Sequence, residues 1–280
     1  MSQPEVANMT SAHQGRRAGH AAQAAPWSTA ITATTETQVF VRGAALDEVI
    51  GQESLPAMVL RLWRGEAGTA AEAELLGACM VASIDHGALS PSALVARTIA
   101  STRAMPMSAL AGGILAFGEL HGAVVTRAMR IIATAPHGDG VQEWADEVFR
   151  TERGAGRRLP GVGHRWHQHD LRAERLIELA QAASDGHYPA AVRALAASVG
   201  AHVGHPVAVN IDGALAVALN VLRLDPEYGD FLFAISRGFG LAAHIVEERD
   251  RERPMRTIDP TSAYYDGTPI PNSETQEDAQ

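Results

Sequence analysis

The sequence contains no lysine, since all 23 basic residues among its 280 are arginine. A Schiff-base aldolase and a pyridoxal-phosphate enzyme need a lysine amine, and a P-loop nucleotidase needs the lysine of its motif, so these three classes are excluded. Any chemistry on a carbonyl group or an anion must therefore use arginine, histidine, carboxylates or backbone amides.

Other features are scarce as well. Cys79 is the only cysteine, so no internal disulfide can form, and we expect a reducing, cytoplasmic compartment. No run approaches the roughly 20 apolar residues of a membrane span, and Arg16-Arg17 lacks the apolar stretch of a secretory signal, so we expect no membrane partner. The net charge of −9 disfavours a nucleic-acid partner.

The periodicity of apolar residues predicts a mostly α fold with short N-terminal strands. β-branched residues between 27 and 43 predict one strand through Val39 and Val41 and allow a second after Ile31, with Gly43 ending the region. Apolar spacings of three and four then predict helices over 71–84, 91–101, 106–117, 123–133, 142–152, 172–183, 189–199 and 212–221, followed by a last pair over about 227–250. Ser90-Pro91 is typical of a helix start, with Ser90 as the N-cap. Residues 1–25 and 266–280 carry few large apolar side chains, so we expect both segments to be disordered and dispensable for catalysis.

Four short stretches place titratable residues beside glycine at breaks between the expected helices. They are Asp85-His86-Gly87, His121-Gly122, Gly161-Val162-Gly163-His164 and Asn210-Ile211-Asp212-Gly213. Glycine lets a substrate approach the backbone, and a helix N-terminus binds anions and keeps a nearby histidine neutral. Taken singly, each stretch is more typical of a structural histidine at a helix end than of a functional site.

The ordered set of these stretches resembles the citrate synthase superfamily, and most of all its short members, the citryl-CoA lyases. The resemblance runs from about Val39 to Arg256. The further motifs that carry it are Val81-Ala82-Ser83-Ile84, Pro91-Ser92-Ala93, Leu115-Ala116-Phe117-Gly118, Asp170-Leu171-Arg172 and Ser236-Arg237-Gly238. The resemblance implies a two-domain helical fold that closes over the substrate. We expect a large domain over 26–120 and 223–265 and a small domain over 121–222.

The resemblance also implies the site residues. The catalytic trio falls on His121, His164 and Asp212. The positions that hold the substrate carboxylates fall on His86, Arg172 and Arg237. It further implies a homodimer, or a multiple of one, in which Arg253 near the C-terminus reaches the site of the partner.

The trio suits the cleavage of citryl-CoA on chemical grounds alone. A base removes the proton of the tertiary hydroxyl, the carbon–carbon bond breaks, the acetyl-CoA enolate is stabilised, and an acid protonates its carbon. His164 suits the first task, a neutral His121 the stabilisation by hydrogen bonding, and Asp212 the protonation. The scheme needs no metal and no tightly bound cofactor, because the coenzyme A ester is itself the substrate and the other product is a dicarboxylate.

The glycine-rich loop before His164 is a candidate for the phosphates of coenzyme A. Arg157, Arg158 and Arg165 flank it, and the amides around Gly161 and Gly163 add donors. A solvated basic loop remains an equal alternative for each arginine. The cluster of His164, His167 and His169 lacks a full ligand set for zinc, so we do not expect a metal there.

Two departures from the family pattern bear on the substrate. Asp170-Leu171-Arg172 stands where the family has Asp-Pro-Arg, which predicts a less stiff loop, and Gly122-Ala123 stands where it has Gly-Gly.

The choice between lyase and synthase depends on a further feature. Citrate synthases are usually longer by an N-terminal helical region that we do not find in this sequence, so we expect a lyase. A short citrate or 2-methylcitrate synthase is the alternative, because the same trio serves both reactions. A non-catalytic protein that binds CoA esters is a further alternative, which the intact trio disfavours.

Overall fold

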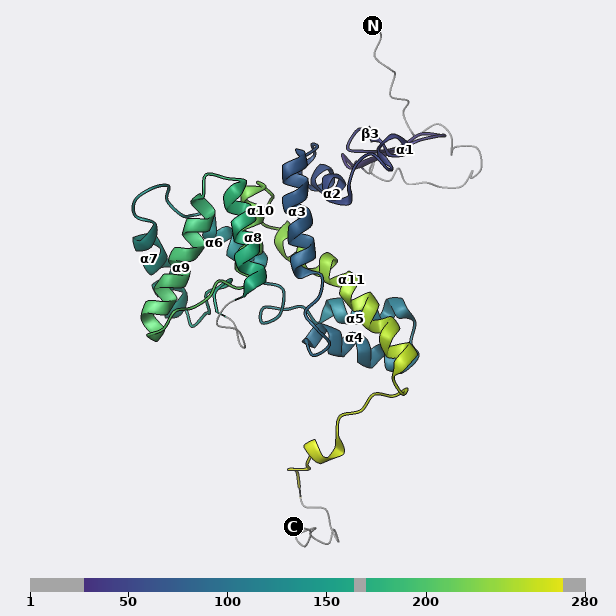
Figure 1. Ribbon diagram of the computed structural model, residues 1–280. Helices are drawn as coiled ribbons and strands as arrows, with labels where there is room; N and C mark the ends of the chain where they lie inside the picture. Colours follow the sequence, from purple (N-terminus) through teal and green to yellow (C-terminus); the bar gives the residue numbers. More distant parts are fainter. Residues whose placement is uncertain (1–27, 164–169, 269–280) are drawn as a thin grey trace, which may run out of the picture.

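A computed structural model describes residues 28–163 and 170–268, and this part of the chain is mostly helical (Figure 1). Three short strands come first and pair antiparallel in the order β1-β2-β3, with Thr32 opposite Val41 and Phe40 opposite Ala45. The strands are β1 (Thr32–Thr34), β2 (Val39–Val41) and β3 (Ala44–Ala45). The helices are α1 (Leu46–Val49), α2 (Leu55–Arg64), α3 (Ala70–Ser83), α4 (Pro91–Ser101), α5 (Pro106–Leu115), α6 (Val125–Ile132), α7 (Val141–Gly154), α8 (Leu171–Ala182), α9 (His187–Val203), α10 (Ile211–Val221) and α11 (Tyr228–Arg251), with a 3-10 turn over Pro260–Ser262. The mostly α prediction with short N-terminal strands is confirmed.

Helix α10 is the centre of the larger apolar core. Its residues from Ala214 to Leu219 have no exposed surface, because α3, α6, α8 and α9 surround the helix. An Ala- and Leu-rich sequence without a polar face is typical of a helix that is buried all round. This packing holds the N-terminus of α10, and therefore Asp212, at a fixed place among the surrounding helices.

A second, smaller core joins α4 and α5 to the C-terminal half of α11. Its buried residues include Ala96 and Ala100 of α4, Ala109 of α5, and Leu241 and Ile245 of α11. Figure 1 shows α11 running from the region of α3 and α10 to this second group. Helix α11 thus connects the two cores. The predicted boundaries of a large and a small domain stay a prediction.

Three local expectations need correction. The pair of helices expected over 227–250 is one continuous helix, α11, which its interior glycines do not interrupt; Gly240 packs closely against Ile84, whereas Gly238 faces open space. Ser90 precedes α4, but its side chain does not cap the helix; its hydroxyl donates to the carbonyl of Gly87 at 3.2 Å. A third strand, Ala44–Ala45, follows Gly43.

The ends of the chain complete the description. Residues 1–25, expected to be disordered, lie outside the described residues, as does the end of the predicted tail beyond 268. Over 28–163 and 170–268, no helix combines the length and the apolar character that crossing a bilayer requires.

Candidate active site

Four of the predicted site residues come from the ends of helices or the loops between them, and a fifth comes from the interior of a helix. His86 lies between α3 and α4, His121 follows α5, Arg172 and Asp212 are the second residues of α8 and α10, and Arg237 lies within α11. The fold brings His86 against Arg172, and it brings Arg172 and Arg237 close enough to act electrostatically on Asp212. His164 and Arg165 lie outside the described residues.

His121 lies against the N-terminus of α4. Its Nε2 accepts the backbone N–H of Ser92 at 3.3 Å and lies 3.0 Å from the Ser92 hydroxyl. A ring nitrogen that accepts an amide N–H carries no proton, so the ring is neutral and its proton is on Nδ1. The positive end of the helix dipole also disfavours an imidazolium there. The contacts of His121 with Ser92 thus favour a neutral imidazole.

A row of aromatic rings connects His121 to Arg237. The ring of Phe117 lies 5.4 Å from that of His121 and packs edge-to-face on Phe233 at 5.5 Å between centroids. The guanidinium of Arg237 in turn lies 4.8 Å from the centroid of Phe233. Aromatic rings thus lie against both polar groups.

Arg237 is a buried cation with an unused donor. It is 2% exposed, and its Nε donates to the carbonyl of Ser83 at 3.0 Å. Its buried Nη1 has no hydrogen-bond partner among the described residues. Burial lowers the pKa of the guanidinium, although Asp85 and Asp212 act in the opposite direction. Because an unpaired buried donor is costly, this nitrogen is suited to an anionic group of a bound ligand.

Arg172 is fixed by its neighbour Asp170. The Asp170 carboxylate accepts the backbone N–H of Arg172 at 3.1 Å and both Nε and Nη2 of its guanidinium, at 3.1 and 2.9 Å. Burial acts to raise the pKa of Asp170, but these bonds outweigh it and hold the pKa below its usual value. The remaining Nη1 of Arg172 lies 3.2 Å from Nδ1 of His86. The loop expected to be less stiff with Leu171 in place of proline is therefore held by the aspartate.

Asp212 sits in a turn that two glycines make possible. Asn210 caps α10 by accepting the backbone N–H groups of Asp212 and Gly213, at 3.0 and 3.2 Å. A Cβ on Gly161 would lie 2.7 Å from Cα of Gly213, so only glycine permits this approach. Burial raises the pKa of Asp212 to about 6, with Arg237 and Arg172 opposing the rise and Asp230 adding to it. A carboxyl group with this pKa can both give and take a proton near neutral pH.

The predicted CoA-binding residues divide into two groups. Gly161 and Gly163 pair with the strand-like segment before α10, where the N–H of Gly163 donates to the carbonyl of Ala208 at 2.8 Å. Arg157 is engaged by Glu152 through two hydrogen bonds of 3.0 Å, and the carbonyl of Arg158 accepts from Arg127. A CoA role for these residues stays a prediction.

A groove of about 820 Å³ adjoins this loop. It is lined by residues of α8 and α9 and by residues 204–209, among them small residues such as Ala197 and Gly200 and the charged Glu174, Glu178 and Arg193. The sequence analysis did not anticipate this groove, because its lining comes from segments without a chemical motif.

Arg253 lies apart from this cluster, in the exposed segment that follows α11. Its predicted contact with a partner subunit stays a prediction. His244 escaped the sequence analysis altogether, whereas Asp85 and Ser92 appeared there within motifs but without an assigned role. Ser92 acts through its backbone amide, which no side-chain pattern reveals, and His244 contacts Asp85 from a remote helix.

Comparison with known proteins gives a consistent result. The family model described as citrate synthase, C-terminal domain, matches residues 5–258. The citrate synthase of Haloferax volcanii is 29% identical over 219 residues, which are 75% of this chain. The chain spans about half, 56%, of the length of the curated relatives it matches.

Two solved structures extend the comparison. A citryl-CoA lyase from Hydrogenobacter thermophilus superposes with a TM-score of 0.78 at 30% identity, over 89% of this chain and 97% of that one. An ATP citrate lyase from Methanothrix soehngenii, in complex with citrate and coenzyme A, superposes with a TM-score of 0.76 at 19% identity, over 97% of this chain and 46% of that one. The second likeness concerns the fold alone.

Proposed function

Because the chain belongs to the citrate synthase family, we propose that it is a CoA-dependent carbon–carbon lyase. Its substrate is citryl-CoA, or a related 3-hydroxy-acyl-CoA, and its products are acetyl-CoA and oxaloacetate, or a related oxo acid. Asp212 carries this proposal, because a carboxyl group with a pKa of about 6 beside two arginines suits proton transfer at a carbon next to bound carboxylates. The structural match to the citryl-CoA lyase covers 97% of the length of that enzyme, which supports cleavage rather than condensation.

Substrate carboxylates bind at the arginines. The unpaired Nη1 of Arg237 donates to one of them, and Arg172, oriented by Asp170, supplies a second planar donor. His86 completes this set: its Nδ1 faces Arg172, so Nε2 carries the proton of the neutral ring and is the donor toward the substrate.

Cleavage then proceeds with the proton transfers in order. A base removes the proton of the tertiary hydroxyl, a role we assign to His164. The carbon–carbon bond breaks, its electron pair passes to the acetyl-CoA fragment, and the hydroxyl carbon becomes the ketone of oxaloacetate. His121 donates a hydrogen bond from Nδ1 to the enolate oxygen, and protonated Asp212 delivers its proton to the enolate carbon.

We place coenzyme A along the Gly161–Gly163 loop. Arg157, Arg158 and Arg165 beside this loop are suited to phosphate groups, whereas the N–H of Gly163 is already donated to Ala208. The adjoining groove of about 820 Å³ has room for the adenosine portion, and the small residues in its lining leave space for a flat ring. No tightly bound cofactor is required.

We also propose a homodimer built on α11. Its exposed apolar residues Phe231, Ile235, Phe239 and Val246 are each more than half exposed, and the first three are spaced by four residues along one face. A contiguous apolar face of this kind marks an interaction surface. Light scattering at micromolar concentration should give a dimer or a multiple of one, and Phe239→Glu should shift it toward monomer. A wild-type monomer with full activity contradicts this assignment, including the contact of Arg253 with the partner.

Two assays separate the candidate functions. Incubation with citryl-CoA should release acetyl-CoA and oxaloacetate in equal amounts, detected by chromatography, and Asp212→Asn should abolish the release. A citrate or 2-methylcitrate synthase, favoured by the Haloferax volcanii relative, would instead release free coenzyme A from acetyl- or propionyl-CoA with oxaloacetate. Binding of CoA esters without turnover in either assay would leave the non-catalytic alternative.

A further inference from the structure

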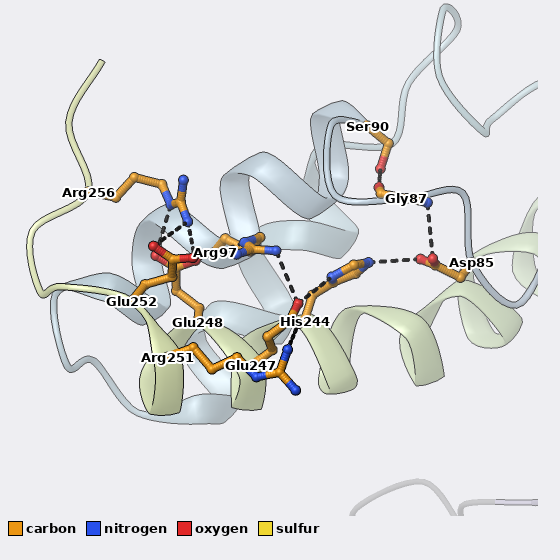
Figure 2. Close-up of polar contacts among 10 residues, drawn as sticks. All are labelled: Asp85, Gly87, Ser90, Arg97, His244, Glu247, Glu248, Arg251, Glu252 and Arg256. Atoms are coloured by element: carbon orange, nitrogen blue, oxygen red, sulfur yellow. Dashed lines mark hydrogen bonds and ion pairs between the residues drawn. The ribbon is translucent and has the colours of Figure 1, made fainter. Parts of the chain in front are cut away.

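A series of polar contacts joins α11 to the turn that carries His86 (Figure 2). His244 lies about two helical turns after Arg237, and its Nε2 is 3.1 Å from Oδ1 of Asp85. Because an ionised carboxylate only accepts hydrogen bonds, Nε2 carries the proton. The side chain of His244 is 15% exposed, so protein atoms hold it in this direction.

Asp85 closes the turn around His86. Its Oδ2 accepts the backbone N–H of Gly87 at 3.0 Å, and the carbonyl of Gly87 accepts the hydroxyl of Ser90 at 3.2 Å (Figure 2). His86 is the residue between Asp85 and Gly87, so its backbone lies inside this hydrogen-bonded turn. Burial acts to raise the pKa of Asp85, but the N–H groups of Gly87 and His86 and the imidazole of His244 outweigh it and lower the pKa, which keeps the carboxylate ionised.

Helix α11 approaches this turn unusually closely. A Cβ on Gly240 would lie 2.5 Å from the carbonyl oxygen of Ile84 and 2.9 Å from Oδ1 of Asp85. The glycine therefore lets His244, one turn further along α11, reach the carboxylate. On its other side, Nδ1 of His244 lies 3.8 Å from Glu247, which accepts a hydrogen bond from Arg97 of α4 at 3.3 Å. The imidazole is thus held between the Asp85 carboxylate and a carboxylate tied to a second helix.

We infer that His244 is a positioning residue, which acts through Asp85 to hold the 84–90 turn so that His86 stays against Arg172. The contact between His86 and Arg172, 3.2 Å, joins two loops far apart in the sequence and depends on the shape of each. Asp170 fixes the Arg172 side, and Asp85 with His244 fixes the His86 side. This inference rests on the proposed function only in taking His86 and Arg172 as carboxylate ligands.

The contact between Asp85 and His244 should stabilise the 84–90 turn without contributing much to the stability of the fold as a whole. The Asp85 side chain is 41% exposed, and ion pairs open to solvent contribute little to global stability. His244→Ala should therefore fold normally, which makes the variant informative. His244→Gln retains an N–H donor near the position of Nε2. Arg251→Ala is the matched control, since it removes an ion pair with Glu247 on the same helix without reaching Asp85.

Two measurements test the inference. Hydrogen exchange of a peptide spanning 84–90 should become about tenfold faster in His244→Ala, because the loss of one charge-assisted hydrogen bond releases the turn. The KM for citryl-CoA should rise about tenfold while kcat changes by less than about threefold, since carboxylate binding is weakened and the proton-transferring groups are untouched. His244→Gln should recover most of both effects, and Arg251→Ala should show neither.

Unchanged exchange of the 84–90 peptide in His244→Ala overturns the inference whatever the activity. Faster exchange with an unchanged KM also overturns it, because the turn would then be held for a purpose other than substrate binding. If the wild-type protein neither cleaves citryl-CoA nor condenses the products, the proposed function fails. The exchange measurement then decides the positioning role by itself, because it requires no turnover.

Discussion

Replacing Asp212 by asparagine should make the fold more stable at pH 8 while it removes the activity. The folded chain keeps the Asp212 proton up to a pH of about 6, because burial raises the pKa from its ordinary value of 3.8. The unfolded chain loses this proton near pH 4, so the folded state is penalised increasingly between these two pH values and by a constant amount above them. One pKa unit corresponds to about 1.4 kcal/mol, which gives a penalty of about 3 kcal/mol at pH 8. Asparagine has the same shape and carries no charge, so it should relieve most of this penalty.

Urea unfolding of both proteins between pH 3.5 and 8 measures the effect. The difference in unfolding free energy should be near zero at the acid end, grow in favour of Asp212→Asn as the pH rises to about 6, and level off above. Over the same range kcat for cleavage should be about 10²–10⁴-fold lower in the variant. Asp146→Asn is the control, because hydrogen bonds from Ser198 and Gln142 lower the pKa of Asp146 and its neutralisation should bring no gain. An Asp212→Asn protein that is less stable than wild type at pH 8, or that keeps normal turnover on every CoA ester tried, would refute the reasoning.

Four further outcomes follow from the same contacts. His121→Ala should lower kcat by about 10²–10³-fold with little change in affinity, measured by steady-state kinetics, because it removes the enolate donor. Arg237→Ala should raise the KM for the substrate by at least roughly 30-fold, whereas the surface variant Arg150→Ala should leave it unchanged. Glu248→Ala should cost about 3 kcal/mol of unfolding free energy, since the 1% exposed Glu248 holds both Arg97 and Arg256 at 2.8 Å; urea unfolding checks this. Binding of oxaloacetate at pH 7 should take up protons, measured by calorimetry in two buffers of different ionisation enthalpy, and Asp212→Asn should abolish the uptake.

The helices were predictable because their patterns are local. Ala71 to Ile84 and Ser90-Pro91 carry propensity and boundary signals within a few residues, and α3 and α4 lie within about one residue of the expected bounds. The same reasoning divided 227–250 into two helices, although α11 is continuous. The close approach of Gly240 in α11 to Ile84 joins segments distant in the sequence, so no local pattern reveals it.

The residue types of the site and a neutral His121 could be proposed from the sequence, but the raised pKa of Asp212 could not. The motifs placed His121 and Asp212 at helix starts, and the structure indeed has Asp212 in the first turn of α10. The neutral state of His121 depends on the amide of Ser92, and the pKa of Asp212 depends on the side chains that bury it. The contact between Asp85 and His244 joins residues 159 positions apart, so no local pattern contains it.

The arrangement of charges links substrate binding to the state of Asp212. Arg237 and Arg172 are the groups that hold the pKa of Asp212 down, in opposition to its burial. When substrate carboxylates bind these two guanidinium groups, the positive potential at Asp212 falls and water is expelled, and both changes favour the protonated acid. Oxaloacetate is fully ionised at pH 7, so protons taken up on its binding must go to the protein. Cleavage needs Asp212 protonated, since it delivers a proton to the enolate carbon. The carboxylates that position the substrate therefore also favour the protonation state in which the reaction can finish.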